Sequence, residues 1–239
     1  MTFEEQLNQI IENERKALRL NQQLENALYG GEYQGSGITQ NPLYYLNSGM
    51  NAWQNVEFPD GFDFVAEFKN IPSRGMNGML MGTSGVKTIT IICDAEGTVD
   101  LNQLVRASSV EVLDLSKFKP VPSSANYLAY GSLNLVTIKG KLDFSNCTAL
   151  TYLFTNGTQI KDFEVVEGSI KVTFDISNCK LFTAESLNSV LLGLSPDVTG
   201  QTLTLTKYET VKAIYDAVYG EGAWDVLAAS KNNWTIAYN

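Results

Sequence analysis

The sequence predicts an α/β repeat protein: a solenoid of short parallel strands that follows an N-terminal helix and ends in a C-terminal α/β cap. Three features indicate this fold class. An apolar pattern returns at intervals of roughly 25 residues, which is typical of solenoids because each repeat then forms one turn. The segment 1–28 contains neither Gly nor Pro, and helical periodicity appears after Leu181.

The chain of 239 residues therefore divides into five segments. We assign residues 1–29 to a helix and candidate coiled coil, 30–40 to a Gly-rich linker, 41–85 to an N-terminal cap segment, 86–181 to the solenoid and 182–239 to the C-terminal cap.

The first segment is rich in Glu, Gln, Leu, Lys and Arg, which are good helix formers. Its apolar residues fit two coiled-coil registers equally well. One register contains Phe3, Leu7, Ile10, Ala17, Leu24 and Leu28, with Asn21 as a polar seam residue, and the other contains Leu7, Ile11, Leu18 and Leu28. We expect a parallel coiled coil that makes the chain a homo-oligomer, a trimer, with Asn21 fixing the register. The alternative is a helix that packs on its own domain.

The segment from Asn41 to Gly85 is rich in aromatic residues and Met. Pro59–Gly61, "PDG", predicts a turn, and "FDFVAEF" after it alternates like a half-buried strand. We expect this segment to cover the open end of the repeats.

Four repeats align on apolar residues at positions 1, 4 and 6. They are Val86-Ile89-Ile91, Val110-Leu113-Leu115, Leu133-Val136-Ile138 and Ile160-Phe163-Val165. Each turn should place its strand beside the same strand of the next turn, with positions 4 and 6 buried. The pattern blurs between Leu150 and Phe174, which leaves the number of turns open.

The last segment begins with a predicted helix at Phe182–Leu194, with Thr183 as its N-cap. An alternating strand, "QTLTLTK", a second helix that ends at Gly220 and a final strand, "NNWTIAYN", follow. We expect these elements to seal the last repeat.

Two pentapeptides, "DFSNC" at 143–147 and "DISNC" at 175–179, are predicted to be solenoid corners. Asp, Ser and Asn side chains can satisfy backbone groups that leave the strand ladder, and a compact Cys can fill the space beneath. "DLSKF" at 114–118 is a third version. The residues assigned to these corners are Asp143, Asn146, Cys147, Asp175, Asn178 and Cys179. A Cys147–Cys179 disulfide is the alternative.

The composition excludes several classes of function. The net charge is −9 and the chain has no His, so it offers neither a basic face for nucleic acid nor the commonest general base and metal ligand. The three cysteines lack the close pairs of a zinc site. We expect no enzyme activity, no cofactor, no metal, no nucleic-acid partner and no membrane insertion.

The candidate ligand surface is the loop "SSANYLAYGS" at 123–132. Tyr127 and Tyr130 lie there among small polar residues, without helical or strand periodicity. They either form a binding surface on the solenoid or cover its core, and the sequence favours neither.

The repeats, with stretches such as "LDFSNCTALTYLF", resemble BspA-type leucine-rich repeats. The tail "FTAESLNSVLLGL…TLTLTKYETV…WDVLAASKNNWTIAYN" resembles the C-terminal cap of such proteins encoded in bacteriophage and prophage genomes of gut bacteria. The resemblance covers roughly residues 41–239. It implies a curved leucine-rich-repeat solenoid, a binding or structural role and no catalytic residues.

The sequence thus predicts a non-enzymatic phage virion structural protein, a tail or baseplate fibre or receptor-binding component that presents its repeats to a host surface glycan or protein. The N-terminus lacks a signal-peptide pattern, so we expect synthesis in the host cytoplasm and assembly with other virion proteins. The alternatives are a head fibre or capsid decoration protein and a bacterial cell-surface adhesin of the same repeat type.

Overall fold

The computed structural model describes residues 54–68, 71, 75–150, 152–154 and 159–239. The predicted linker at 30–40 and the predicted coiled-coil helix at 1–29 lie outside the described residues. All the residues assigned to oligomerisation therefore lie there too: Phe3, Leu7, Ile10, Ile11, Ala17, Leu18, Asn21, Leu24 and Leu28.

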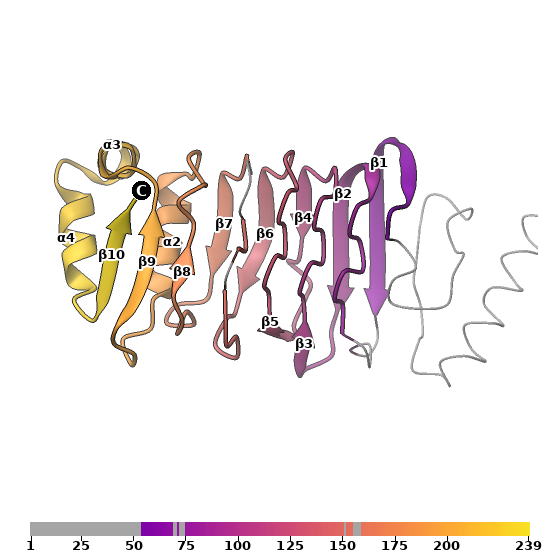
Figure 1. Ribbon diagram of the computed structural model, residues 1–239, viewed down its shortest axis with the longest axis horizontal. Helices are drawn as coiled ribbons and strands as arrows, with labels where there is room; N and C mark the ends of the chain where they lie inside the picture. The colour runs from indigo at the N-terminus through magenta and orange to yellow at the C-terminus, as the bar shows by residue number, and fades with distance from the viewer. Residues whose placement is uncertain (1–53, 69–70, 72–74, 151, 155–158) are drawn as a thin grey trace, which may run out of the picture.

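A five-stranded parallel sheet forms one side of the molecule, and its strands stack along the long axis (Figure 1). The strand order is β1-β2-β4-β6-β7. The bounds are β1 Glu57–Phe68, β2 Ser84–Cys93, β4 Val112–Asp114, β6 Thr137–Leu142 and β7 Asp162–Val165. Each turn of the chain adds one strand beside the previous one, so the protein is a β-solenoid of parallel strands.

The register of this sheet relates each turn to the next. Phe64 pairs with Ile89, Ile89 with Leu113 and Leu113 with Ile138, and all four side chains are buried. The partners are about 25 residues apart in the sequence, a length within the usual range of one solenoid turn. The first strand, β1, belongs to the same sheet although it lies within the segment that we assigned to the N-terminal cap from the sequence.

The predicted alignment is right for the repeats at Val86, Val110 and Ile160 and wrong for the one at Leu133. Leu133 is 57% exposed, whereas Leu135 is fully buried. Because Ile138 pairs with Leu113, the third repeat begins at Leu135, and the four repeats become nearly equal in length. In this register Gly140 occupies position 6, so an apolar match could not find it.

Gly140 makes a bulge in β6. Thr137 pairs with Asp162 and Lys141 with Glu164, so β6 has two more residues than β7 over this stretch. The backbone of Gly140 has a φ of +93°, and a Cβ there would lie 2.7 Å from the Leu115 carbonyl oxygen. Glycine therefore permits both the left-handed conformation and the close approach of the preceding turn.

The opposite side carries the return path of each turn. Strands β3 (Thr98–Asp100) and β5 (Val121–Ser124) pair there, and a second sheet has the order β10-β9-β8. The second sheet contains β8 Phe174–Asp175, β9 Gln201–Leu205 and β10 Trp234–Tyr238. A bridge between Leu150 and Phe174 connects the return path to this sheet. The apolar core lies between the two sides.

Helix α2 (Ala184–Gly193) takes the place of a sixth strand beside β7. The Thr183 side chain caps it, as the sequence predicts, by accepting a hydrogen bond from the Ser186 backbone N–H. The Ser186 and Ser189 hydroxyls accept hydrogen bonds from the backbone N–H groups of Phe163 and Val165, at 2.9 and 3.0 Å. Helices α3 (Tyr208–Tyr219) and α4 (Ala223–Ser230) follow at the C-terminal end (Figure 1).

The three corner sequences share one local geometry. In each, the Asp carboxylate accepts a hydrogen bond from the backbone N–H two residues on, at 3.0 Å for Asp114, 2.8 Å for Asp143 and 2.9 Å for Asp175. The backbone N–H of the fifth residue donates to the carbonyl of the second, at 3.0, 2.9 and 2.9 Å. Asn146 and Asn178, to which we gave a similar role, are exposed and make no side-chain hydrogen bond within the described residues. The Asp carboxylate already accepts a hydrogen bond from a backbone N–H of each turn.

The two pentapeptides lie on different sides of the solenoid. Asp143 follows β6 in the five-stranded sheet, whereas Asp175 follows β8 in the second sheet. This explains why their separation in the sequence exceeds one turn. Cys147 and Cys179 are buried thiols, so the alternative disulfide is not formed.

Candidate functional site

The candidate site is a cluster of four side chains on the return path, which we call the tyrosine ladder: Arg106, Tyr127, Tyr130 and Tyr152. The rings of Tyr127 and Tyr152 stack, with centroids 5.2 Å apart and planes at 22°. Tyr130 meets Tyr127 edge-on at 5.5 Å. The Arg106 guanidinium carbon lies 5.8 and 5.4 Å from the Tyr127 and Tyr130 ring centroids.

The backbone that presents the ladder repeats from turn to turn. Gly78, Gln103, Tyr127 and Tyr152 occupy equivalent places in four successive turns, with φ values of +65°, +56°, +58° and +60°. This left-handed conformation costs a residue other than glycine about 1–2 kcal/mol. Three successive turns thus carry a side chain where the first turn has glycine.

Contacts within the ladder hold its side chains in place. Arg106 Nη1 donates a hydrogen bond to Gln103 Oε1 at 2.9 Å. Its guanidinium contacts two aromatic rings, an arrangement that favours the cation. The ladder therefore offers an ordered aromatic surface bordered by a cation, an amide and phenol hydroxyls. Such groups can stack on a ligand and hydrogen-bond it.

We identified Tyr127 and Tyr130 from the sequence, and the structure brings them together. Arg106 and Tyr152 were not identified. The available signal was the period, because Tyr152 follows Tyr127 by one turn and Tyr130 follows Arg106 by one turn. Side chains one period apart lie side by side in a solenoid.

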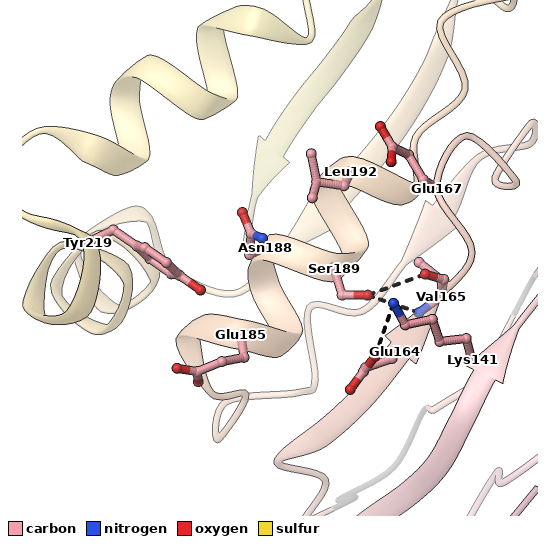
Figure 2. A pocket seen from close by; sticks show the side chains of 9 residues that line it. All are labelled: Lys141, Glu164, Val165, Glu167, Glu185, Asn188, Ser189, Leu192 and Tyr219. Carbon is pink, nitrogen blue, oxygen red and sulfur yellow. Dashed lines mark hydrogen bonds and ion pairs between the residues drawn. The ribbon is translucent and has the colours of Figure 1, made fainter. Parts of the chain in front are cut away.

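A second feature is an open cleft of about 310 Å³ between the five-stranded sheet, α2 and the end of α3. Glu164, Glu167 and Glu185 line it together with Lys141, which lies 3.6 Å from Glu164 in an exposed ion pair. Figure 2 shows Glu167 at one end of the cleft and Glu185 at the other. Glu167 and Glu185, at opposite ends, do not form the carboxylate pair around one point that glycoside hydrolysis requires (Figure 2). The Ser189 hydroxyl in the cleft is already bonded to β7.

An ionic cluster joins α3 to α4. Lys212 Nζ contacts Asp216 at 2.9 Å and Asp225 at 2.6 Å. Asp216 also accepts hydrogen bonds from the Trp224 and Gly222 backbone N–H groups at 2.8 and 3.0 Å. The Lys212 hydrogen bond, followed by that from Trp224, lowers the pKa of Asp216 to about 2. The cluster holds α4 against α3, because Lys212 and Asp216 of α3 bond to Asp225 and to the Trp224 backbone of α4.

Cys93 and Cys147 lack the properties of a nucleophile. Burial raises the pKa of Cys147 to about 12 and, together with the neighbouring Asp94, raises that of Cys93. The Cys147 thiol donates to the Pro122 carbonyl of the preceding turn at 3.3 Å. These thiols stay protonated near neutral pH and fill the core.

Two further properties concern the part of the chain that the structure describes. No group of three or more His, Cys, Asp or Glu side chains there is placed to hold a metal ion. No helix in the same residues is long and apolar enough to cross a membrane.

Comparison with known proteins adds no relative to this picture. No family model matches the chain, and no curated protein or solved structure is significantly similar to it.

Proposed function

We propose that the chain is a non-enzymatic phage virion structural protein, a tail or baseplate fibre or receptor-binding component that displays its solenoid to the host surface. The tyrosine ladder is the observation that carries this proposal. It is an ordered aromatic and cationic surface on a rigid stack of strands, and aromatic side chains with Arg are enriched where proteins bind partners.

We further propose that the repeats are of the BspA leucine-rich type and that residues 182–239 act as their cap. The regular length of the turns and the one strand that each turn adds to the five-stranded sheet support the first statement. The two α2 hydroxyls that bond to β7 support the second, because an open strand edge would otherwise invite pairing with another chain.

Residues 1–29 would assemble three chains through a coiled coil. Three linked sites gain apparent affinity when they engage one surface together, even if each binds weakly. Sedimentation of the full chain should give the mass of a trimer. The double substitution Leu7→Asp and Leu24→Asp puts charge into the seam and should give a monomer, whereas a monomeric unsubstituted chain would refute the assembly.

The composition of purified particles tests the proposed location. Mass spectrometry of phage particles should find the chain at a fixed copy number, and particles lacking it should adsorb poorly to host cells. Recovery of the chain from the envelope of uninfected bacteria, and not from particles, would favour a surface adhesin. Labelling of the capsid rather than the tail by a specific antibody would favour a head fibre or decoration protein.

A further inference from the structure

We propose that the tyrosine ladder binds an uncharged oligosaccharide, with Tyr152 as the stacking platform and Arg106, Gln103 and the phenol hydroxyls as hydrogen-bonding groups. The inference rests on the proposed host-binding function and names the class of ligand. It comes from the alignment of one cation and stacked rings across successive turns of the solenoid.

Tyr152 is the end of the ladder and its most accessible ring. Tyr127 lies between Arg106 and Tyr152, so its neighbours occupy its faces. Tyr152 is 46% exposed, and its only ring contact within the described residues is with Tyr127. Its remaining surface can receive the C–H face of a sugar ring, because the negative face of an aromatic ring attracts weakly positive hydrogens.

The backbone supports a role for these side chains beyond folding. Tyr127 and Tyr152 adopt the conformation that Gly78 adopts without strain two and three turns earlier. Bulky residues held in a disfavoured conformation are concentrated at functional sites, so the outlier itself points to the side chain. Glycine would satisfy the turn and lose only the ring.

The length of the ladder selects an oligomer. Arg106 lies 5.8 Å from the centre of Tyr127, which lies 5.2 Å from the centre of Tyr152. Arg106, Tyr127 and Tyr152 belong to three successive turns, so a ligand that reaches both Arg106 and Tyr152 must extend about 10 Å along the solenoid, two strand spacings. Two or more linked sugar units fit this span, whereas a single unit reaches only one end.

Charge favours an uncharged ligand over an acidic one. The chain has a net charge of −9, and Arg106 is the only arginine among the residues that the structure describes. The field of the whole chain repels a polyanion, and the two rings already accommodate the guanidinium. Binding should therefore change little between low and moderate salt, whereas an acidic peptide held by Arg106 would be released by salt.

The test uses the intact chain and a printed array of uncharged oligosaccharides, their acidic counterparts and acidic peptides. Three proteins are compared: the unsubstituted chain, Tyr152→Gly and the control Tyr219→Gly. Tyr219 is 44% exposed, nearly the same as Tyr152, but lies on α3. We expect binding to uncharged oligosaccharides, weakened about tenfold by Tyr152→Gly and unchanged by the control.

The urea midpoints of the same samples separate binding from folding. Tyr152→Gly should leave the midpoint unchanged, because glycine relieves the left-handed strain as the ring stack is lost. A large drop in midpoint together with unchanged binding would show a purely structural stack and overturn the proposal. So would binding to no oligosaccharide, or preference for acidic glycans or peptides.

The outcome is distinguishable from failure of the proposed function. If particles contain the chain and need it for adsorption, but Tyr152→Gly binds as the unsubstituted chain does, only the ladder proposal fails. If the chain binds uncharged oligosaccharides but is absent from particles, only the virion role fails.

Discussion

Replacing Gly140 by Ala tests the bulge that sets the register of the third repeat. The added Cβ would lie 2.7 Å from the Leu115 carbonyl oxygen and 2.9 Å from the Ser116 backbone nitrogen. Both atoms belong to the backbone of the preceding turn, so neither can move as a flexible side chain can. The bulge would have to shift or the stack would have to open.

Two unfavourable contributions and one favourable one give the magnitude. A left-handed φ costs alanine about 1–2 kcal/mol, and forcing an atom into a filled space costs about 1–3 kcal/mol. Against these costs, alanine makes the unfolded chain less flexible, which stabilises the folded state by about 0.4–1 kcal/mol. We therefore expect Gly140→Ala to lower the free energy of unfolding by about 1–5 kcal/mol, measured as a lower midpoint in urea.

Gly131→Ala is the matched control. Gly131 has a φ of +75°, but the nearest atom to an added Cβ, the Ala107 Cα, would be 3.9 Å away, at ordinary contact distance. Ala107 itself, one turn earlier, already has a φ of +54°. Only the cost of the left-handed φ remains, less the gain from the stiffer unfolded chain, and the expected loss of unfolding free energy is about 1.6 kcal/mol or less. Equal losses for the two substitutions would refute the close approach at Gly140.

Three further predictions concern other parts of the fold. Ser186→Ala should lower the free energy of unfolding by about 1–3 kcal/mol in urea, because the Phe163 N–H loses its acceptor; an unchanged midpoint would mean that the hydroxyl does not serve the strand edge. Stability should fall as the pH drops from about 3.9, the unfolded pKa of Asp, toward about 2, the pKa of Asp216 beside Lys212, and Asp216→Asn should flatten this dependence in acid titrations; an identical slope would contradict the ion pair. Cys147 should resist iodoacetamide at pH 8 until the chain unfolds, and rapid labelling of the native protein, read by mass spectrometry, would contradict its burial.

Most of the solenoid could be predicted from the periodicity of apolar residues, because the same positions are buried in each turn. The repeats beginning at Val86, Val110 and Ile160 each place three apolar side chains in the core, so their spacing could be recognised in the sequence. The third repeat was misplaced because its position 6 is Gly140, which contributes a conformation and no apolar side chain. A pattern that counts apolar residues cannot detect that contribution.

The C-terminal elements were predicted as helices and strands that seal the last repeat, but the hydrogen bonds between α2 and β7 were not predicted. Ser186 lies within the helix that the sequence predicts at Phe182–Leu194, and its bond to β7 depends on where α2 docks. The side of the solenoid on which Asp175 lies could not be predicted from the sequence either. It follows from the pairing of β8 with β9 rather than with β7.

The tyrosine ladder could likewise be predicted only in part, because its contacts join different turns. Tyr127 and Tyr130 are close in the sequence and could be selected as an aromatic loop. Their partners Arg106 and Tyr152 come from neighbouring turns, and only the register places them in contact. Because successive turns differ slightly in length, a small error in the alignment is enough to hide such a column.

The central claim is that the solenoid binds the host surface through the ladder, and competition for adsorption tests it most directly. Phage adsorption to host cells would be measured with increasing amounts of the soluble intact chain, either unsubstituted or carrying Tyr152→Gly. We expect the unsubstituted chain to block adsorption and Tyr152→Gly to need about tenfold more protein for the same effect. Absence of inhibition by the unsubstituted chain, or equal inhibition by both, would contradict the claim.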